Sequence, residues 1–491
     1  MRVPRFERQA CSNMIELTLS EIARVTHGQL VHASETPDQI TTVSGPVVTD
    51  SREVVPGAIF IAKPGETTDG HLFVPKAVAA GAALVIVDHV LEVAVPQIVV
   101  SDTVTALGDL ASAVVSMVRA HGQLSVVGIT GSNGKTTTKN LLSTILAKNG
   151  PTVAARASYN NEVGAPLTML EITHDTQFLV VEMGASHVGD IARLVRIARP
   201  DVGVVLKVGL AHAGEFGGIE KTLEAKTEMV TDLHESDVAV LNRDDPRVVS
   251  MAQKTVARVL WFGLDSGADV RATEIQVSAS GTSFLLTLPD PEHPGGQQTL
   301  TRLVHFGVLG DHHVMNALAA SAAAHAHGVD IDQIVSGLES VTRAERWRME
   351  VFHAPHGVTV INDAYNASPD SMAAALKTLA QIVPDSARSV AVLGEMSELG
   401  EFSGEEHDRI GLLAVRLGID RLVVVGPSAR RMHISAIKEG SWDGESVYCE
   451  TQDEAYDYLQ GFLQENDTVL IKSSNSAGLR FLGDRLGQVQ A

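Results

Sequence analysis

The chain has 491 residues, 44% of them hydrophobic and 20% charged, and its 59 acidic and 38 basic side chains give a formal net charge of −21. This is the composition of a globular protein, which argues against disorder, a collagen repeat or a disulfide scaffold, and the length predicts about three domains. The acidic excess and the few aromatic residues argue against a broad nucleic-acid or anionic-membrane surface.

Cysteine usage and the terminal sequence bear on location. Cys11 and Cys449 lie at opposite ends of the chain with no motif around either, which is typical of reduced thiols in a cytosolic protein. The N-terminal residues lack the apolar core of a signal peptide. The longest apolar region, 77–100, is interrupted by charged residues and Pro96, so it lacks the roughly 20 consecutive apolar residues that span a bilayer. We expect a soluble, cytoplasmic protein.

The first two segments of the chain differ in pattern. Residues 1–123 contain the apolar runs Ala58–Ala62 and Ala83–Val87 around a helical stretch, Phe73–Ala80, which predicts a small α/β domain. In residues 124–338, short apolar runs alternate with helices. This alternation predicts a mainly parallel sheet that is covered by helices on both faces.

Two further features complete the predicted architecture. The stretch from about Asp265 to Phe306, with turn residues at 290–296, indicates an antiparallel insertion in the second domain. Residues 339–491 return to the α/β alternation, and we expect a Rossmann-like third domain there. Its predicted strands are 358–362, 389–393, 421–425 and 468–471. The predicted fold class is therefore α/β, with three domains.

The strongest chemical motif is a glycine-rich loop between the buried run Ser125–Thr130 and a predicted helix at 139–148. Backbone N–H groups in such a loop, and at a helix N-terminus, bind phosphate. Lys135 can reach the β- and γ-phosphates, and the Thr136 hydroxyl can ligate Mg²⁺. The strict phosphate-loop pattern has glycine where this chain has Ile129, so an ordinary glycine turn is the alternative. The candidate phosphate-binding residues are Gly131, Ser132, Asn133, Gly134, Lys135, Thr136 and Thr137.

Two more polar residues follow buried runs. Glu182 stands at the carboxyl end of the run at 178–181, where an α/β nucleotide site places a metal ligand. The alternative is a carboxylate that faces solvent at the strand end. His212 lies in a glycine-rich stretch, 209–217, and could contact a metal or a phosphate. A histidine that hydrogen-bonds its own loop is the alternative there.

Lys226 has an unusual position in a predicted helix, 218–233. It falls on the apolar stripe of that helix, three residues after Leu223 and four before Val230. Burial lowers the pKa of a lysine and makes its amine nucleophilic, so Lys226 could react with carbon dioxide and become a metal-binding carbamate. The alternative is a side chain that extends past the stripe to water.

Several motifs together match one enzyme family. They are Gly131-Ser-Asn-Gly-Lys-Thr-Thr-Thr-Lys139, Asn160-Asn-Glu-Val-Gly-Ala-Pro-Leu167, Glu182-Met-Gly-Ala185, Ala211-His212, Ala225-Lys-Thr-Glu228, Asn362-Asp-Ala-Tyr-Asn-Ala-Ser-Pro-Asp-Ser-Met372 and Leu393-Gly-Glu-Met-Ser-Glu-Leu-Gly400. With them the chain resembles the Mur ligases over all three segments. The resemblance is strongest to the branch that handles D-alanyl-D-alanine.

This resemblance implies an activity. The chain would be an ATP-dependent amide ligase of cytoplasmic peptidoglycan-precursor synthesis, joining D-alanyl-D-alanine to UDP-N-acetylmuramoyl-tripeptide through an acyl phosphate. These two substrates and ATP would be its small-molecule partners, and Mg²⁺, at two sites, its cofactor. We expect a monomer with no nucleic-acid partner and no stable membrane insertion.

The resemblance also implies roles for single residues. Lys135, Lys226, His212 and Arg348 would be catalytic. Residues 131–137 would bind ATP with Asn316 at the adenine, Asp363 at the ribose and Arg348 at the γ-phosphate. Thr136 and Glu182 would ligate one Mg²⁺, and Glu182, His212 and carbamylated Lys226 the second. The substrate-binding residues would be Ser51 and Arg52 in the first domain, Asn160 and Asn161 in the second, and Lys472 in the third.

Some residues depart from the family pattern. Gly310-Asp-His-His313 stands where many relatives have Gly-Arg-His-Asn, and Lys472-Ser-Ser-Asn475 stands where Lys-Gly-Ser-Arg is frequent. Arg243 replaces a residue that is commonly small. None of these departures touches the phosphate loop, Glu182 or Lys226, so we interpret them as variation within the family.

Other functions are weaker interpretations. A sister ligase with another amino acceptor, such as the diaminopimelate-adding enzyme or folylpolyglutamate synthase, is disfavoured by the motifs that begin at Asn160 and Asp363. A regulatory nucleotide switch would need a guanine-reading Asn-Lys-x-Asp motif, and a dehydrogenase a GxGxxG loop, and neither is present. An inactive scaffold is disfavoured because the chain retains Lys135, Thr136, Glu182 and Lys226.

Overall fold

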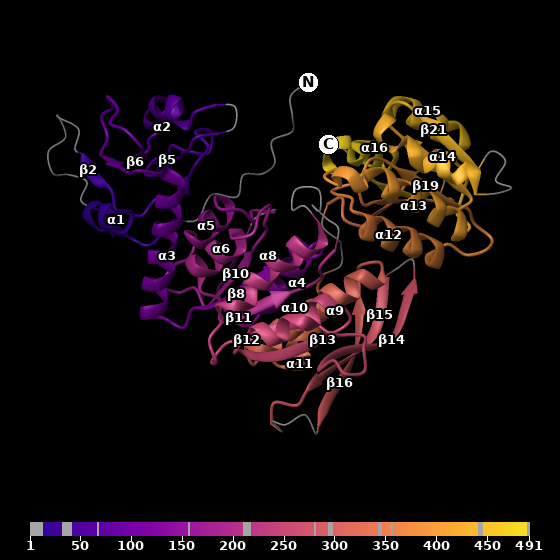
Figure 1. The fold of residues 1–491 in the computed structure, drawn as a ribbon, viewed down its shortest axis with the longest axis horizontal. Helices are drawn as coiled ribbons and strands as arrows, with labels where there is room; N and C mark the ends of the chain where they lie inside the picture. The colour runs from indigo at the N-terminus through magenta and orange to yellow at the C-terminus, as the bar shows by residue number, and fades with distance from the viewer. Residues whose placement is uncertain are drawn as a thin grey trace.

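The computed structural model describes residues 13–31, 42–65, 68–155, 158–209, 218–278, 281–292, 298–341, 346–354, 357–439 and 445–488. Within these residues, sheets of five, nine and six strands follow one another along the chain, beside a short pair formed by β1 (Leu17–Thr18) and β3 (Thr42–Val43). The five- and six-stranded sheets lie at opposite sides of the molecule, with the nine-stranded sheet between and below them (Figure 1).

The five-stranded sheet has the predicted strand–helix–strand unit at its centre. Its order is β2 (Gln29–Val31), β7 (Gln97–Val99), β6 (Leu84–Val87), β5 (Ile59–Ile61) and β4 (Val47–Val48), all parallel except β2. The helical segment is η1 (Gly70–Phe73) followed by α2 (Val74–Ala79), which covers one face. Helices α1 (Leu19–Val25) and α3 (Thr103–His121) cover the other face.

Helix α3 connects the first sheet to the second. Its apolar side chains join one core cluster with strands of both sheets and with α5 (Gly164–Met169) and α6 (Asp190–Ala198), beside which it lies in Figure 1. By length and composition α3 could span a membrane, and it is the one such helix in the described ranges. Half of the most apolar 18-residue stretch of α3 is buried inside the protein. That burial is typical of a core helix, and the sequence interpretation did not single this segment out.

The nine-stranded sheet is mainly parallel, as predicted. Its order is β16 (Thr299–Phe306), β15 (Gly281–Pro289), β14 (Val270–Ser278), β13 (Arg258–Gly263), β12 (Val238–Asn242), β11 (Val202–Val205), β8 (Ser125–Thr130), β10 (Phe178–Glu182) and β9 (Thr152–Ala154). The predicted antiparallel insertion is β14–β16, and it extends this sheet at one edge, because β14 pairs with β13.

Helices cover both faces of this sheet because buried side chains alternate along its strands. Val126 and Val205 enter a cluster with α3, α5, α6 and α8 (Ile219–Thr231), while Val127 and Val204 enter a second cluster. The helices of the second cluster are α4 (Lys135–Leu146), α10 (Asp311–Ala326) and α11 (Ile331–Glu339). The short α9 (Pro246–Ser250) and η2 (Met251–Lys254) follow β12.

The six-stranded sheet confirms the predicted Rossmann-like alternation. Its order is β17 (Glu350–His353), β18 (Thr359–Asn362), β22 (Thr468–Lys472), β19 (Ser389–Leu393), β20 (Arg421–Val425) and β21 (Ser446–Cys449), parallel except β17. β17 and β21 were not predicted. One face carries α12 (Pro369–Ile382), α13 (Ser403–Arg416) and α14 (Arg430–Lys438), and the other α15 (Gln452–Phe462) and α16 (Leu479–Leu486).

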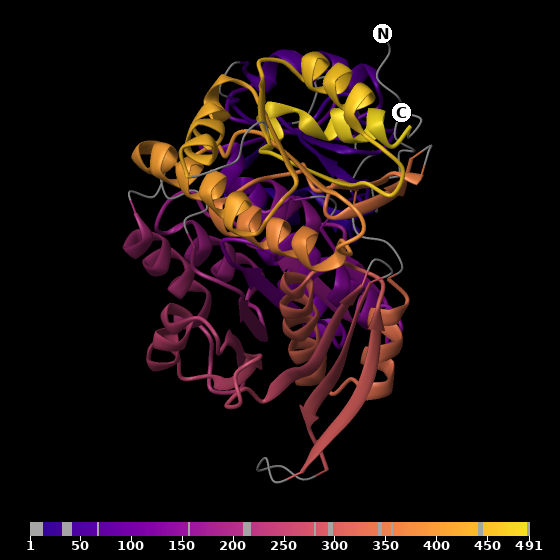
Figure 2. The same cartoon turned by 90° about the vertical axis from the view of Figure 1, so that its right-hand side faces the viewer.

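The two larger sheets meet through their carboxyl edges. Helix α12 of the last domain contacts α10 and β14 of the central one. Figure 2 shows the orange helices of the last domain above the central sheet. Strands β8, β10, β18 and β22 all end toward this junction, as the residues of the cavity there show. In open α/β sheets this edge is where ligands bind.

Candidate functional site

A cavity of about 420 Å³ lies between the central and the last domain. Its walls come from the carboxyl ends of strands and from the N-terminal turns of α4, α10 and α12. Both domains supply charged residues to it. The predicted site residues that line it are Ser132, Asn133, Gly134, Lys135, Thr136, Thr137, Asn160, Glu182, Asn316, Arg348, Asp363 and Lys472.

The glycine-rich loop leads directly into α4, which begins at Lys135 and not at 139 as predicted. Lys135 and Thr136 are therefore the first residues of the helix, where free backbone N–H groups and the helix dipole favour a phosphate. Gly134 has φ +85°, and a Cβ there would clash with Asn316 Oδ1. Ser132 Oγ accepts the N–H of Gly209 at 2.8 Å, which ties the loop to the segment after β11. The positive φ of Gly134 and its packing against Asn316 explain why position 134 requires glycine.

Lys135 is held inside the loop. Its Nζ donates to the carbonyl of Gly131 at 2.9 Å. Burial lowers the pKa of Lys135, and the charge of Arg348 acts in the same direction, while Glu182 opposes both. An ammonium group at this position supplies positive charge where a phosphate chain would enter the loop.

Thr136 and Glu182 both contribute oxygen atoms to the lining of the cavity. Thr136 Oγ1 lies 3.3 Å from Ser158 Oγ and accepts from Arg348 Nη2 at 3.3 Å. Glu182, the last residue of β10, accepts the amide N–H of Asn160 at 2.8 Å through Oε1. Its Oε2 is buried and has no hydrogen-bond partner among the described residues. The hydroxyl and this carboxylate oxygen line one cavity, and such a donor set fits Mg²⁺, which takes oxygen ligands.

Lys226 lies on the buried face of α8, which confirms the position expected from the apolar stripe. Its exposed fraction is 4%, and its neighbours on that face include Ala225 and Met229. Burial lowers the pKa of the Lys226 amine to about 7, and the charge of Lys135 contributes. Near neutral pH the amine is therefore partly unprotonated and nucleophilic. His212, the predicted partner of this lysine, lies outside the described residues.

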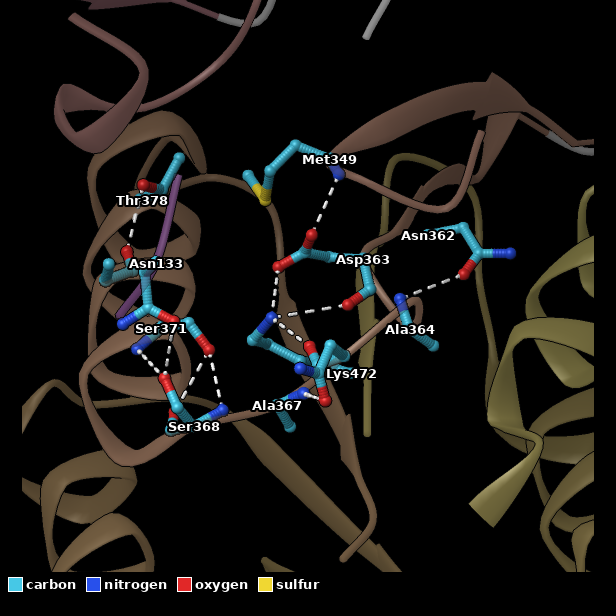
Figure 3. A network of polar contacts seen from close by, with 12 residues as sticks. Asn133, Met349, Asn362, Asp363, Ala364, Ala367, Ser368, Ser371, Thr378 and Lys472 are labelled. Atoms are coloured by element: carbon cyan, nitrogen blue, oxygen red, sulfur yellow. Dashed lines mark hydrogen bonds and ion pairs between the residues drawn. The ribbon is translucent and has the colours of Figure 1, made fainter. Parts of the chain in front are cut away.

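The predicted ribose and substrate residues Asp363 and Lys472 form an ion pair with each other. Lys472 Nζ lies 2.6 Å from Asp363 Oδ2, as Figure 3 shows. It also donates to the carbonyl of Asn366 at 3.0 Å. Asp363 Oδ1 accepts the backbone N–H of Met349 at 3.0 Å. One carboxylate thus fixes the segment next to Arg348 and compensates a lysine whose side chain is 3% exposed.

Contacts across the cavity join the two domains, and the sequence interpretation did not predict them. Ser368 Oγ donates to Asn133 Oδ1 at 3.1 Å (Figure 3), and Ser158 Oγ lies 3.0 Å from the Tyr365 hydroxyl. Lys207 Nζ lies 3.2 Å from Asp370 Oδ2. Tyr365 and Ser368 belong to the Asn362–Met372 motif, so their presence near the site had a signal. Ser158 belongs to none of the motifs, and it lies 207 residues from Tyr365 in the sequence, so no local pattern could predict its contact.

Asn316 and the unusual His313 lie one turn apart on α10. Asn316 Oδ1 accepts from Thr138 Oγ1 at 3.4 Å, so its side chain faces the phosphate loop. Burial lowers the pKa of His313 well below its usual value, and the charges of His312, Arg348 and Lys472 act in the same direction. The departure from the family pattern therefore places a neutral imidazole in the wall of the cavity.

Three predicted substrate residues lie outside this cavity. Ser51 is buried, and exposed Arg52 pairs with Asp50, with Nη2 2.6 Å from Oδ2. Asn161 Oδ1 accepts the N–H groups of Val163 and Gly164 at the start of α5. The structure thus separates the residues of the first domain from those around the phosphate loop.

The first domain also brings together His71, Asp88 and His89 at metal-ligand spacing. His71 Nδ1 lies 2.7 Å from Asp69 Oδ1, and His71 Nε2 accepts the backbone N–H of Asp88 at 3.1 Å. Both ring nitrogens of the buried histidine thus have protein partners. We interpret this cluster as a hydrogen-bond network that fixes the end of β6.

Comparison with known proteins matches each part of the chain to one family. The Mur ligase family, catalytic domain, matches residues 46–115, the Mur ligase middle domain 129–324, and the Mur ligase, glutamate ligase domain 347–475. A curated Mycobacterium tuberculosis (strain ATCC 25618 / H37Rv) protein, UDP-N-acetylmuramoyl-tripeptide–D-alanyl-D-alanine ligase, is 42% identical, with 96% of this chain and 98% of that protein covered.

Solved structures agree. MurF from Acinetobacter baumannii has a TM-score of 0.85 at 32% identity, covering 97% of this chain and 99% of its own. The MurF ligase from Thermotoga maritima, solved in complex with ADP, has a TM-score of 0.77 at 28% identity, covering 90% and 97%. With relatives this similar over nearly its whole length, the chain belongs to the Mur ligase family.

Proposed function

We propose that the protein is an ATP-dependent ligase that joins D-alanyl-D-alanine to UDP-N-acetylmuramoyl-tripeptide. The observation that carries the proposal is the cavity between the domains, where the phosphate loop, Glu182 and Arg348 line one space. The activity named for the Mycobacterium tuberculosis relative, which covers 96% of this chain, gives the substrates. The product would be a peptidoglycan precursor made in the cytoplasm, by a monomer.

The reaction needs a leaving group, because a carboxylate does not react with an amine in water. The substrate carboxylate attacks the γ-phosphorus of ATP, the bond to ADP breaks, and an acyl phosphate forms. The amine of D-alanyl-D-alanine then attacks the acyl carbon, loses a proton and expels phosphate. Lys135 and Arg348 offset the negative charge that gathers when two anions meet in the first step.

The oxygen donors in the cavity support the binding of a metal ion. Thr136 and Glu182 would hold one Mg²⁺, since the Thr136 hydroxyl and Glu182 Oε2, which has no hydrogen-bond partner in the part of the chain that the structure describes, both offer oxygen ligands. Glu182, His212 and Lys226, as a carbamate, would hold a second. The lowered pKa of Lys226 supports carbamate formation, which needs a neutral amine. Bound Mg²⁺ would neutralise phosphate charge and orient the γ-phosphoryl group.

We assign the remaining roles by domain. Residues 1–123 would hold the UDP end through Ser51 and Arg52, 124–338 would bind ATP, and 339–491 would close over it. Asn316 would contact adenine, and Asp363 the ribose. Asn160, Asn161 and Lys472 would contact the other substrates. Because Asp363 and Lys472 pair with each other, a ribose bound at Asp363 would compete with this ion pair.

The direct test measures phosphate release from ATP with UDP-N-acetylmuramoyl-tripeptide, with and without D-alanyl-D-alanine. We expect phosphate release that depends on the dipeptide. Mass spectrometry should show a product that is heavier than the UDP-linked substrate by the mass of D-alanyl-D-alanine minus water. Equal phosphate release with and without the dipeptide would exclude this activity. Lys226→Ala should be inactive and partly restored by short-chain carboxylates, and full activity of that variant would remove its assigned role.

A further inference from the structure

Arg348 sits in a backbone segment of unusual conformation. Its two neighbours, Trp347 and Met349, have φ of +62° and +56°, values that residues other than glycine rarely adopt. Such a conformation persists only where surrounding contacts enforce it. The side chain between these residues is therefore held at a defined place in the wall of the cavity.

Three hydrogen bonds of the backbone of this segment stabilise the conformation. The backbone N–H of Trp347 donates to Glu350 Oε2 at 2.9 Å, and that of Met349 to Asp363 Oδ1 at 3.0 Å. The carbonyl of Trp347 accepts the backbone N–H of Tyr365 at 3.0 Å. The last bond ties the segment to the residue whose side chain also contacts Arg348.

Tyr365 meets the guanidinium group of Arg348 face on. The Arg348 Cζ atom lies 4.1 Å from the centroid of the Tyr365 ring, within the range of a cation–π interaction. The Tyr365 hydroxyl lies 3.0 Å from Ser158 Oγ in the central domain. Ser158 Oγ in turn lies 3.3 Å from Thr136 Oγ1, which also accepts from Arg348 Nη2 at 3.3 Å.

These four side chains close a ring of contacts across the domain boundary. Arg348 and Tyr365 come from the last domain, and Ser158 and Thr136 from the central domain. An arginine has many rotamers, and fixing them costs conformational entropy. A flat ring under the guanidinium, anchored at its hydroxyl to the other domain, removes most of those rotamers once the domains meet.

We propose that Tyr365 is a positioning residue, which with Ser158 orients the guanidinium of Arg348 over the phosphate loop when the two domains come together. The inference rests on the proposed function, in which Arg348 serves the γ-phosphate. Tyr365 acts through Arg348. Its removal is expected to impair γ-phosphate recognition and phosphoryl transfer, and not the binding of the dipeptide.

A kinetic test distinguishes the contribution of the Tyr365 ring from that of the Tyr365 hydroxyl. Tyr365→Phe removes the hydrogen bond to Ser158, and Ser158→Ala removes it together with the contact to Thr136 Oγ1. Each should lower kcat by about two- to tenfold, and the double variant should be no lower than Ser158→Ala alone. Tyr365→Leu also removes the stacked face and should lower kcat by about five- to thirtyfold. KM for D-alanyl-D-alanine should stay within about twofold of wild type. Multiplicative effects of Tyr365→Phe and Ser158→Ala would contradict the shared bond.

Nucleotide binding gives a readout that does not need turnover. The ratio of the Kd for ADP to the Kd for a non-hydrolysable ATP analogue reports recognition of the γ-phosphate. Tyr365→Leu should reduce this ratio, and in an Arg348→Ala background it should change nothing further. An unchanged ratio, or equal loss of affinity for both nucleotides, would show a merely structural role and overturn the proposal.

A matched control lies in the same domain. Arg485 stacks over Tyr456 with Cζ 3.4 Å from the ring centroid, away from the cavity. Tyr456→Leu removes the same kind of contact and should leave kcat and the nucleotide ratio unchanged; a similar fall in both would overturn the proposal. If wild type lacks dipeptide-dependent phosphate release, the proposed function fails, and the nucleotide ratio still tests the orientation of Arg348.

Discussion

Lys226 allows a quantitative prediction, because a buried ammonium destabilises the folded protein in a pH-dependent way. The change is Lys226→Met, which keeps an unbranched side chain of similar length and removes the charge. The exposed Lys221 of the same helix, in Lys221→Met, is the matched control, since its side chain is 56% exposed. Both proteins would be studied free of metal and carbon dioxide, so that the amine is the species present.

The magnitude follows from the lowered pKa. The amine titrates near 10.5 in the unfolded chain and at about 7 in the folded one, a difference of about 5 kcal/mol between the two protonation states. Below pH 7 both states are protonated, and the full destabilisation is present. Between pH 7 and 10.5 the unfolded chain binds more protons, so stability rises with pH. From pH 7 to pH 9 this lysine should add about 2 kcal/mol.

Urea unfolding at pH 6, 7, 8 and 9, followed through the transition of the central domain, measures the effect. Lys226→Met should be more stable than wild type at pH 6, and the gap should narrow as the pH rises. Lys221→Met should follow the wild-type profile. A Lys226→Met profile parallel to wild type from pH 6 to 9 would refute a buried amine with a lowered pKa.

Three further predictions concern the cavity. Gly134→Ala, at φ +85° and against the Asn316 amide, should cost about 1–2 kcal/mol in thermal unfolding and abolish ATP binding in calorimetry; wild-type affinity would contradict the close packing. Glu182→Gln should raise the Mg²⁺ concentration for half-maximal activity about tenfold or more without lowering Tm, and an unchanged Mg²⁺ dependence would exclude Glu182 as a ligand. Asp363→Asn leaves the buried Lys472 ammonium without its carboxylate and should destabilise by about 3–5 kcal/mol in urea unfolding; an unchanged midpoint would show that the pair is dispensable.

Local patterns predicted much of the fold and part of the site. Runs of valine, leucine and isoleucine marked β8, β10 and β20, because a strand buried on both faces needs apolar residues at every position. The apolar stripe of α8 placed Lys226 inside. Helix α4 begins earlier than predicted, since its first turn is polar and its start depends on Gly134. β17 and β21 are short and only partly apolar, so their pairing depends on neighbouring strands.

The sequence by itself determined the chemical groups and their order: a phosphate loop, a carboxylate at a strand end and a lysine in an apolar stripe. Such features depend on neighbours within a few residues, whose spacing the backbone geometry fixes. Only the tertiary structure decided that Asp363 pairs with Lys472, and that Tyr365 reaches Ser158 over a separation of 207 residues. These contacts exist because two sheets meet at their carboxyl edges, and local patterns carry no information about which distant segments that packing brings together.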